Sequence, residues 1–458
     1  MKGCDARRIR NPHQYVMSLL YFLLILFSII FSNWNAVAAN KGDINGDGAV
    51  DVKDAILALQ SISGMNPSGI RSEYTLSADV NKDEKIGFAE TLYILQLVAG
   101  VRTVVFTYSP IDVSLLNQIG PLGNVNGRES HALPTDHMYF GAKTPSDPST
   151  EIDIVAPGDM VITSLLLQTN KQASGRILED YAVKGRVGSD MVFILGHISA
   201  LTSELRAQAG SFEGYCNPSF VLDGNTYTQC SKNVQISVAA GEKIGVVAQQ
   251  NNWTIDVFIY DQRVNLAFVN PGRSFGGMDT NENHAVCFID YLSGPDADAM
   301  RQLLGENGIK RTVEPVCGEI MQDIAGTAQG RWYVSMEQYM ALIHDNVDPS
   351  IGVISVGNGI STLPVGAYAF RPEPTGNVNA DFSRVTADGT VYCYEPITSD
   401  IFWEYLYNFR DPNFVYAESG VHILVQMPSA EEVLIAGVSG SKCISAETMP
   451  SQATLFVR

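Results

Sequence analysis

Basic residues are scarce in this chain of 458 residues. Lys and Arg number 30 against 49 Asp and Glu, which gives a formal net charge of -19. Proteins that grip nucleic acid or an anionic membrane surface present clustered cations, so neither is expected as a partner. Charged residues make up only 17% of the chain and hydrophobic residues 45%. The sequence therefore has ample apolar material for buried cores and is not intrinsically disordered.

The sequence also lacks several familiar chemical signatures. It contains no C-x-x-C pair, which argues against a thioredoxin-type redox site and against a zinc site built from cysteines. It contains no G-x-S-x-G elbow, no H-E-x-x-H helix and no glycine-rich phosphate loop. Serine hydrolases of the elbow type, zincins and nucleotide-binding loops are therefore not indicated.

Only one apolar run is long enough to matter for export. It spans residues 16–31 and is followed by the small-x-small pattern of residues 36–38. Four basic residues precede it: Lys2, Arg7, Arg8 and Arg10. We expect residues 1–39 to be a cleaved signal peptide, with retention as an anchor as the alternative. A secreted or cell-surface location follows, with no membrane span after the signal.

Six of the seven cysteines lie beyond that segment: Cys216, Cys230, Cys287, Cys317, Cys393 and Cys443. An even number of cysteines in an exported chain predicts disulfides. We expect Cys216 to pair with Cys230 because they are close in sequence, and Cys393 with Cys443 next. The alternative is that some of the six are buried thiols.

Residues 43–54 carry oxygen ligands at the spacing of an EF-hand loop. Positions 1, 3, 5, 7, 9 and 12 are Asp43, Asn45, Asp47, Ala49 through its backbone carbonyl, Asp51 and Asp54. Gly48 at position 6 permits the sharp turn of such a loop. Calcium is a hard cation that takes six to eight oxygen ligands. The loop therefore predicts a calcium site, and a turn that binds no metal is the alternative.

The same pattern recurs 36 positions later, in residues 79–90. The corresponding ligands are Asp79, Asn81, Asp83, Lys85 through its backbone carbonyl, and Glu90. Glu84 occupies the turn position and Gly87 offers no side chain at position 9, so this loop should bind calcium more weakly. The apolar residues after each loop predict two helices that bury against each other. They are Ala55, Ile56, Leu59 and Ile62, then Leu92, Ile94, Leu95 and Val98.

Residues 41–102 thus resemble a dockerin type I module, in which each EF-hand-like loop is followed by one helix. The resemblance implies calcium-dependent folding and docking to a β-sandwich cohesin module on another secreted protein or at the cell surface. It places the cohesin contacts at loop positions 10 and 11, which here are Val52, Lys53, Phe88 and Ala89, and in the helices after them. Such modules often accompany proteins of polysaccharide catabolic processes.

After about residue 104, short β-branched and aromatic runs alternate with Gly, Pro, Asn and Asp, which is typical of β-sandwiches and barrels. The predicted fold class is mostly β, with a small helical calcium-binding pair followed by two β-rich domains. The predicted boundaries are 41–102, 103–290 and 291–458. The strands are expected near 161–167, 191–194, 233–237, 243–249 and 254–260, and one further helix is expected within 295–308.

Four weak motifs follow one another in residues 119–272. They are S-H-A-L-P-T-D-H at 130–137, A-P-G-D at 156–159, L-G-H-I-S at 195–199 and T-I-D at 254–256. In this order they resemble the lysostaphin-like zinc peptidases of the duplicated-hybrid-motif fold. The resemblance implies that His131, Asp136 and Asp256 hold zinc and that His137 or His197 acts as the catalytic base.

Two departures from that family favour a degenerate, non-catalytic domain. The step from His131 to Asp136 is one residue longer than usual, and residues 254–256 replace a terminal His-x-His. Hydrolytic zinc needs three protein ligands and one open position. A zinc-dependent cell-wall or protein endopeptidase is the alternative.

A third alternative is a carbohydrate-active or carbohydrate-binding protein. It is suggested by what dockerins accompany and by an aromatic cluster in residues 402–409 that sugars could stack upon. The spacing of that cluster fits a strand that packs into a core equally well. The sequence does not identify a polysaccharide or cell-wall ligand.

Overall fold

The computed structural model describes residues 42–45, 50–65, 78, 85–99, 106–125, 131–222, 224–273, 282–335, 338–357, 360–397, 399–400, 410 and 419–458. The chain divides into two compact units, Met1–Arg102 and Thr103–Arg458. Among the described residues, no helix is both long and apolar enough to span a membrane. The predicted signal peptide and the aromatic cluster of residues 402–409 lie outside the described residues.

Two helices, α2 (Val52–Ile62) and α4 (Phe88–Val98), make up the described secondary structure of the first unit. Each begins at position 10 of a predicted calcium loop, and the acidic side chain at position 12 of that loop caps the helix. The Asp54 carboxylate accepts a hydrogen bond from the Asp51 amide at 2.9 Å, and the Glu90 carboxylate accepts one from the Gly87 amide at 2.6 Å. Such contacts satisfy amides that the first helical turn leaves without partners.

The helices pack through small side chains. Ala55 and Ala58 of α2 and Ile94 of α4 lie in one core, together with Ile44 and Ile86. Alanine lets two helix backbones approach closely, and the face of α2 that carries Ala55 and Ala58 is the buried one. The prediction that the bulky residues of α2 bury against α4 is wrong, because Ile56, Leu59 and Ile62 are 47–50% exposed.

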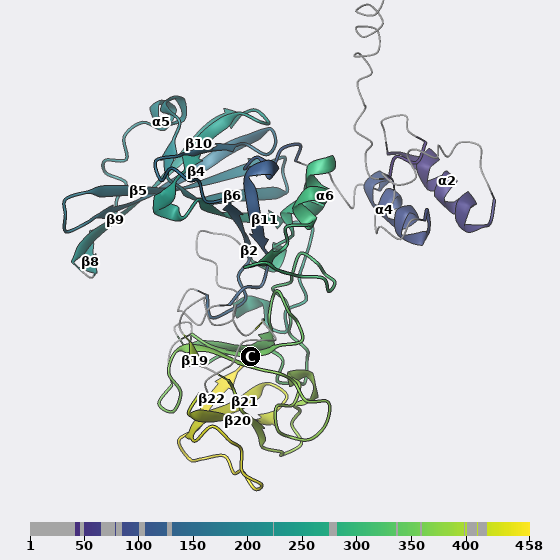
Figure 1. The fold of residues 1–458 in the computed structure, drawn as a ribbon, viewed down its shortest axis with the longest axis vertical. Coiled ribbons are helices and arrows are strands. Elements are labelled where there is room, and N and C mark those ends of the chain that lie inside the picture. The colour runs from purple at the N-terminus through teal and green to yellow at the C-terminus, as the bar shows by residue number, and fades with distance from the viewer. Residues whose placement is uncertain are drawn as a thin grey trace, which may run out of the picture. The chain divides into compact units, whose positions relative to one another are not determined.

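The second unit is built on antiparallel sheets, which confirms the mostly β fold class (Figure 1). The larger sheet in its first half has the order β1-β2-β11-β6-β5-β4-β9-β8. Its strands are β1 (Leu116–Gly120), β2 (His137–Ala142), β11 (Thr254–Asp261), β6 (Met191–Ile198), β5 (Ile177–Val187), β4 (Met160–Lys171), β9 (Asn225–Val238) and β8 (Phe220–Leu222). A three-stranded sheet joins β3 (Ile152–Val155), β10 (Lys243–Val247) and β7 (Ala200–Leu201). All five predicted strands are present, with longer bounds for four of them.

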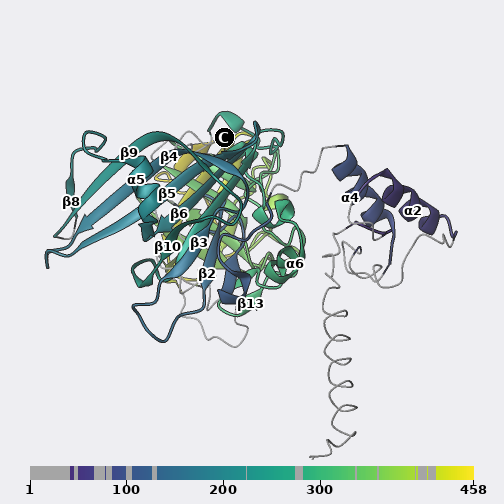
Figure 2. The ribbon, with the colours of Figure 1, turned by 90° about the horizontal axis from the view of Figure 1, so that it is seen from above.

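Strands β4, β5 and β9 extend well past the core, and β8 pairs with β9 at their far end (Figures 1 and 2). We call this extension, residues 168–180 and 219–229, the β arm. The short helix α5 (Ser203–Ala209) lies close to β9. Lys232 of β9 reaches the carbonyl oxygens of Ala209 and Ser211 at the end of that helix.

The remaining large sheet has nine strands in the order β18-β20-β21-β22-β14-β15-β16-β17-β19. They are β18 (Tyr392–Tyr394), β20 (Val421–Ser429), β21 (Glu432–Ser439), β22 (Thr454–Val457), β14 (Gly330–Tyr333), β15 (Tyr339–His344), β16 (Gly352–Val356), β17 (Gly366–Phe370) and β19 (Ser399–Asp400). A two-stranded sheet pairs β12 (Gly305–Glu306) with β13 (Ile309–Lys310). Short 3-10 turns are η1 (Val113–Leu115), η2 (Gln249–Asn251), η3 (Pro271–Arg273), η4 (Glu282–His284), η5 (Phe288–Tyr291) and η6 (Phe382–Arg384).

The helix predicted within residues 295–308 is shorter than expected. It is α6 (Pro295–Arg301). Gly305 follows with φ of 144° and opens β12, where an added Cβ would lie 2.1 Å from the Ile309 carbonyl oxygen. The chain therefore leaves the helical conformation before Gly305.

All six cysteines beyond residue 39 form disulfides. The predicted pairs Cys216–Cys230 and Cys393–Cys443 are confirmed, and the third bond joins Cys287 to Cys317. Three disulfides fit an oxidising, extracellular environment.

Candidate functional site

Six predicted calcium ligands fall within the described residues: Asp43, Asn45, Asp51, Asp54, Lys85 and Glu90. Asp47, Ala49, Asp79, Asn81 and Asp83 lie outside them. The Asp54 carboxylate ties the two ends of the first loop together. One oxygen accepts hydrogen bonds from the amides of Ile44 and Asn45 at 2.9 and 3.1 Å, and the other accepts from Asp51.

Three of these carboxylates are almost completely buried. Asp43 is 1% exposed, and Asp54 and Glu90 are 0% exposed. Burying anionic groups is costly unless a cation compensates them. A carboxylate that accepts backbone hydrogen bonds keeps further lone pairs for a metal. The donor set, hard oxygens gathered beside a helix start, therefore fits calcium.

The outward faces of α2 and α4 carry two matching rows of apolar side chains, which we call the two stripes. The α2 stripe is Val52, Ile56, Leu59 and Ile62, and the α4 stripe is Phe88, Leu92, Leu95 and Val98. Their exposed fractions run from 41% to 74%, with Phe88 the most exposed. Residues spaced in this way share one face of a helix.

The two stripes coincide with the predicted contact positions. Each residue of the α4 stripe lies 36 positions after its counterpart on α2, so the internal repeat extends to the surface. Val52 is 51% exposed and Lys53 is also exposed, while the side chain of Ala89 lies outside the described residues. A contiguous apolar surface of this kind marks a protein interface.

In the second unit, the structure brings the predicted His and Asp residues close together. His137 opens β2 and Asp256 lies on the neighbouring β11, whose other neighbour β6 carries His197 near its end. The Nε2 atoms of His137 and His197 lie 3.8 and 3.3 Å from the same carboxylate oxygen of Asp256. The ring of His131 lies 5.8 Å from that of His137, measured between centroids.

Two further carboxylates hold the other nitrogen of each ring. Asp136 lies 3.3 Å from Nδ1 of His137 and also accepts a hydrogen bond from the Tyr260 hydroxyl at 2.5 Å. Asp180 on β5 lies 2.8 Å from Nδ1 of His197. Carboxylates placed in this way orient imidazole rings so that Nε2 faces a metal. Asp136 therefore has the contacts of an orienting residue.

The neighbouring charges and burial shift the pKa values within this cluster. Burial, reinforced by nearby His137, lowers the pKa of His131 to about 4. Hydrogen bonds to Asp180 and Asp256 raise the pKa of His197 to about 10. For Asp256, burial disfavours the charge, but the nearby His137 and His197 outweigh it and leave its pKa below the ordinary value. The two carboxylates that contact His197 therefore favour its protonated form.

The distances within the cluster meet a simple test for zinc only in part. Ligand atoms 2.0–2.2 Å from a tetrahedral ion lie roughly 3.3–3.6 Å from one another. The distance of 3.3 Å from His197 to Asp256 lies in that range, and the distance of 3.8 Å from His137 to Asp256 lies just above it. Nε2 of His137 is also buried and makes no hydrogen bond within the described part of the chain. His137, His197 and Asp256 are not among the groups of described residues whose ligand atoms all lie within 4.8 Å of one another, so in this arrangement the three do not enclose a zinc ion.

Two other groups of potential metal ligands among the described residues also offer no metal site. They are Cys287 with Asp290 and Cys317, and Cys393 with His422 and Glu447. Each cysteine in them is part of a disulfide, so no thiolate is available to a metal.

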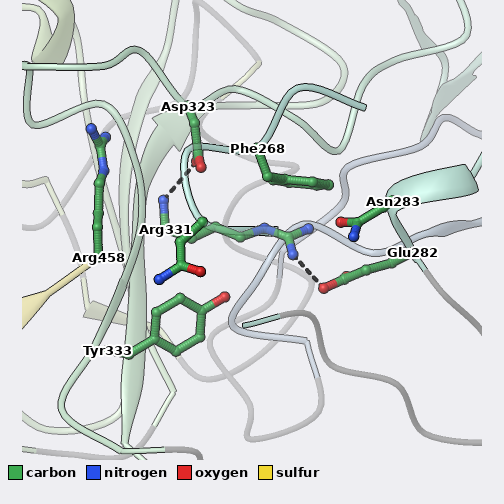
Figure 3. Close-up of a pocket in the computed structure, with 8 residues that line it drawn as sticks. Phe268, Glu282, Asn283, Asp323, Arg331, Tyr333 and Arg458 are labelled. Carbon is green, nitrogen blue, oxygen red and sulfur yellow. Dashed lines mark hydrogen bonds and ion pairs between the residues drawn. The ribbon is translucent and has the colours of Figure 1, made fainter. Parts of the chain in front are cut away.

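A polar pocket between η4 and β14 is structural. Figure 3 shows Arg331 in an ion pair with Glu282 at 2.7 Å, while Asp323 accepts a hydrogen bond from the Arg331 amide. The Arg331 guanidinium also lies 4.4 Å from the centre of the Phe268 ring. The cavity has a volume of about 10 Å³, which holds one water molecule and no larger ligand.

Sequence reasoning missed Asp180 and Tyr260. Asp180 is an ordinary polar residue in a β-rich segment, and only the pairing of β5 with β6 brings it to His197. His197 itself has a positive φ of 61°, at an irregular point where β6 leaves regular pairing. No local pattern of residues signals such a contact.

Comparison with known proteins identifies only the first unit. Residues 41–88 match the Dockerin type I domain. No curated protein and no solved structure matches the chain, and the lysostaphin-like assignment of the β-rich unit stays a prediction. Dockerin type I domains bind calcium and dock to cohesin partners, typically in systems that degrade polysaccharides. The chain therefore carries, at residues 41–88, a calcium-binding dockerin type I domain.

Proposed function

We propose that this is an exported protein whose dockerin unit binds a cohesin module through the two stripes and so fixes the β-rich unit to a larger assembly. The observation that carries the proposal is the exposure of eight apolar side chains on two helices, while the side chains that α2 buries include only the small apolar residues Ala55 and Ala58. Solvent-exposed helices of a folded unit would not otherwise carry such rows.

The energetic contribution of one stripe is substantial. Transferring a Val, Leu, Ile or Phe side chain from water to an interior stabilises by about 1.5–3 kcal/mol, so four half-exposed side chains contribute roughly 3–6 kcal/mol. The two stripes are equivalent by the internal repeat, and each can form the apolar centre of an interface. Loss of both stripes removes the apolar centre of the interface altogether.

Paired charge substitutions test this proposal. We expect Ile56→Glu/Leu59→Glu and Leu92→Glu/Leu95→Glu each to leave one stripe able to bind cohesin. The combined variant should raise the Kd roughly 100-fold, because about 3 kcal/mol of apolar burial is lost. Titration calorimetry with type I cohesin modules measures the effect.

The matched control is Gln60→Glu/Gln96→Glu, which adds two charges to the same helices beside the stripes. It should bind as the unchanged protein does. Unchanged affinity of the combined variant would contradict docking through these helix faces.

A second candidate function rests on the His and Asp cluster. We propose that zinc binds by drawing His137 and His197 closer together around Asp256, with His131 beside them and with Asp136 and Asp180 orienting the two rings. The convergence of two Nε2 atoms on one carboxylate oxygen supports this, as does the order of lysostaphin-like motifs. Bound zinc would supply a Lewis acid with one position left for water, and the residues that replace the family pattern favour binding over peptidase activity.

Metal analysis of the full chain tests the zinc site. After equilibration with zinc and removal of unbound metal, we expect about one equivalent per chain, and we expect Asp256→Ala to lose it. His344→Ala is the control, because His344 lies in the other large sheet and pairs with Asp381 at 2.9 Å. Absence of zinc from the unchanged chain would contradict the zinc site.

A further inference from the structure

We propose that the β arm binds an uncharged polysaccharide chain through one face, which continues outward from the His and Asp cluster. This goes beyond cohesin docking, since it assigns a ligand surface to the β-rich unit. Strand register, two stacked aromatic rings and two amide side chains that make no hydrogen bond within the described residues support it.

Strand register places these residues on one face. Directly paired residues of antiparallel strands project to the same side, as do residues two apart on one strand. Asp180, Gln168 and Gln229 form one row across β5, β4 and β9. The next row on that side crosses the same strands and ends on β8, and consists of Leu178, Asn170, Tyr227 and Phe220. Asp180 also holds His197, so the face begins at the cluster.

Two aromatic rings form a platform near the end of this face. The rings of Phe220 and Tyr227 are stacked, with centroids 5.4 Å apart and an angle of 15° between their planes. Phe220 is 57% exposed, and the Tyr227 hydroxyl accepts a hydrogen bond from Asn170 at 3.3 Å. Because stacked rings cover part of each other's face, the apolar surface that the pair offers is mainly that of the more exposed Phe220.

The polar groups between the platform and the cluster are neutral amides. The side chains of Gln168 and Gln229 make no hydrogen bond to the rest of the described chain. Each amide offers donors and an acceptor, which suits sugar hydroxyl groups because these also donate and accept. The two rows contain no Lys or Arg and include Asp180, so they do not attract a polyanion.

The dimensions suit an extended polymer. Phe220 lies three strands and two residues away from Asp180, which corresponds to roughly 16 Å at ordinary sheet spacings. A chain that lies across the platform and the amides would reach His197, whose side chain is 49% exposed. An uncharged glycan chain can stack on the aromatic surface and form hydrogen bonds with the amides at the same time. It also brings no charge to an acidic protein.

Affinity electrophoresis of the full chain in gels with soluble polysaccharides tests this proposal. Neutral chains such as mixed-linkage β-glucan, xyloglucan and glucomannan should retard the protein, and polygalacturonate should not. Phe220→Ala/Tyr227→Ala should weaken retention roughly tenfold, because the stacking surface is lost. Gln168→Ala/Gln229→Ala, which leaves the aromatic pair intact, should also weaken it. Thermal unfolding should confirm that each variant is folded.

The matched control is Tyr215→Ala. Tyr215 is 52% exposed in the segment before β8, and it lies beside Lys232, which projects toward α5 on the opposite face. Its loss should leave retention unchanged. The proposal would be overturned if no neutral polysaccharide retards the unchanged protein. It would also be overturned if both arm variants are retarded as strongly as the unchanged protein. Sedimentation showing that Phe220→Ala/Tyr227→Ala turns a dimer into a monomer would overturn it as well, because the face would then bind a second copy of the chain.

Discussion

Chelation of calcium is expected to unfold the dockerin unit and abolish cohesin binding while the β-rich unit stays folded. The buried carboxylates of Asp43, Asp54 and Glu90 would then lack the compensating cation. The two helices have 11 residues each, shorter than the roughly 12–15 residues that isolated helices need. The buried part of their shared core consists of three isoleucines and three alanines, which is a small core, so metal binding and folding should be coupled.

Far-UV circular dichroism with and without EGTA measures this effect, and limited proteolysis locates it. Cleavage should fall within residues 41–102 and spare the rest. Asp43→Ala should weaken calcium binding more than Asp79→Ala, because Glu84 already compromises the second loop. The control is Asp153→Ala, which removes only an exposed ion pair with Lys243 in the β-rich unit. Identical spectra with and without chelator would refute the coupling.

Arg410→Met is expected to destabilise the β-rich unit by about 3–5 kcal/mol. The Arg410 guanidinium donates to both oxygens of Asp345 at 2.9 and 2.7 Å and to Glu306 at 2.7 Å. All three side chains are 0–2% exposed. Burial raises the pKa of Glu306 even beside Arg410. Removal of the cation would leave two acidic groups without compensation in the interior.

Guanidinium chloride unfolding compares the midpoint of Arg410→Met with that of the unchanged protein. Arg186→Met serves as the control, because Arg186 is exposed on β5 and should change stability by less than about 0.5 kcal/mol. Arg410→Met/Glu306→Gln should recover part of the loss, since one buried charge is removed. An unchanged midpoint for Arg410→Met would show that the ion pairs contribute little.

Features governed by local spacing could be predicted from the sequence. The calcium loops depend on ligands within twelve residues, and the dockerin match covers the first of them completely. The strands near 161–167 and 254–260 follow from short β-branched runs, and the Cys216–Cys230 bond joins residues 14 apart. Each of these signals lies within one short stretch of chain.

Features that depend on long-range packing could not be predicted from the sequence. The buried face of α2 is set by how closely α4 approaches, so Ala55 and Ala58 are buried while Ile56 and Leu59 are not. The contact of Asp180 with His197 depends on the pairing of two strands. The contact of Asp136 with Tyr260 is likewise set by the pairing of β2 with β11.

The central claim is that calcium folds a surface that docks to cohesin through the two stripes. Surface plasmon resonance of the full chain against immobilised type I cohesins, in calcium and then in EGTA, tests it most directly. We predict saturable binding in calcium to at least one cohesin, complete release in EGTA, and rebinding when calcium is restored. Binding that is equal in calcium and EGTA would contradict the account, as would failure to bind any cohesin of the panel.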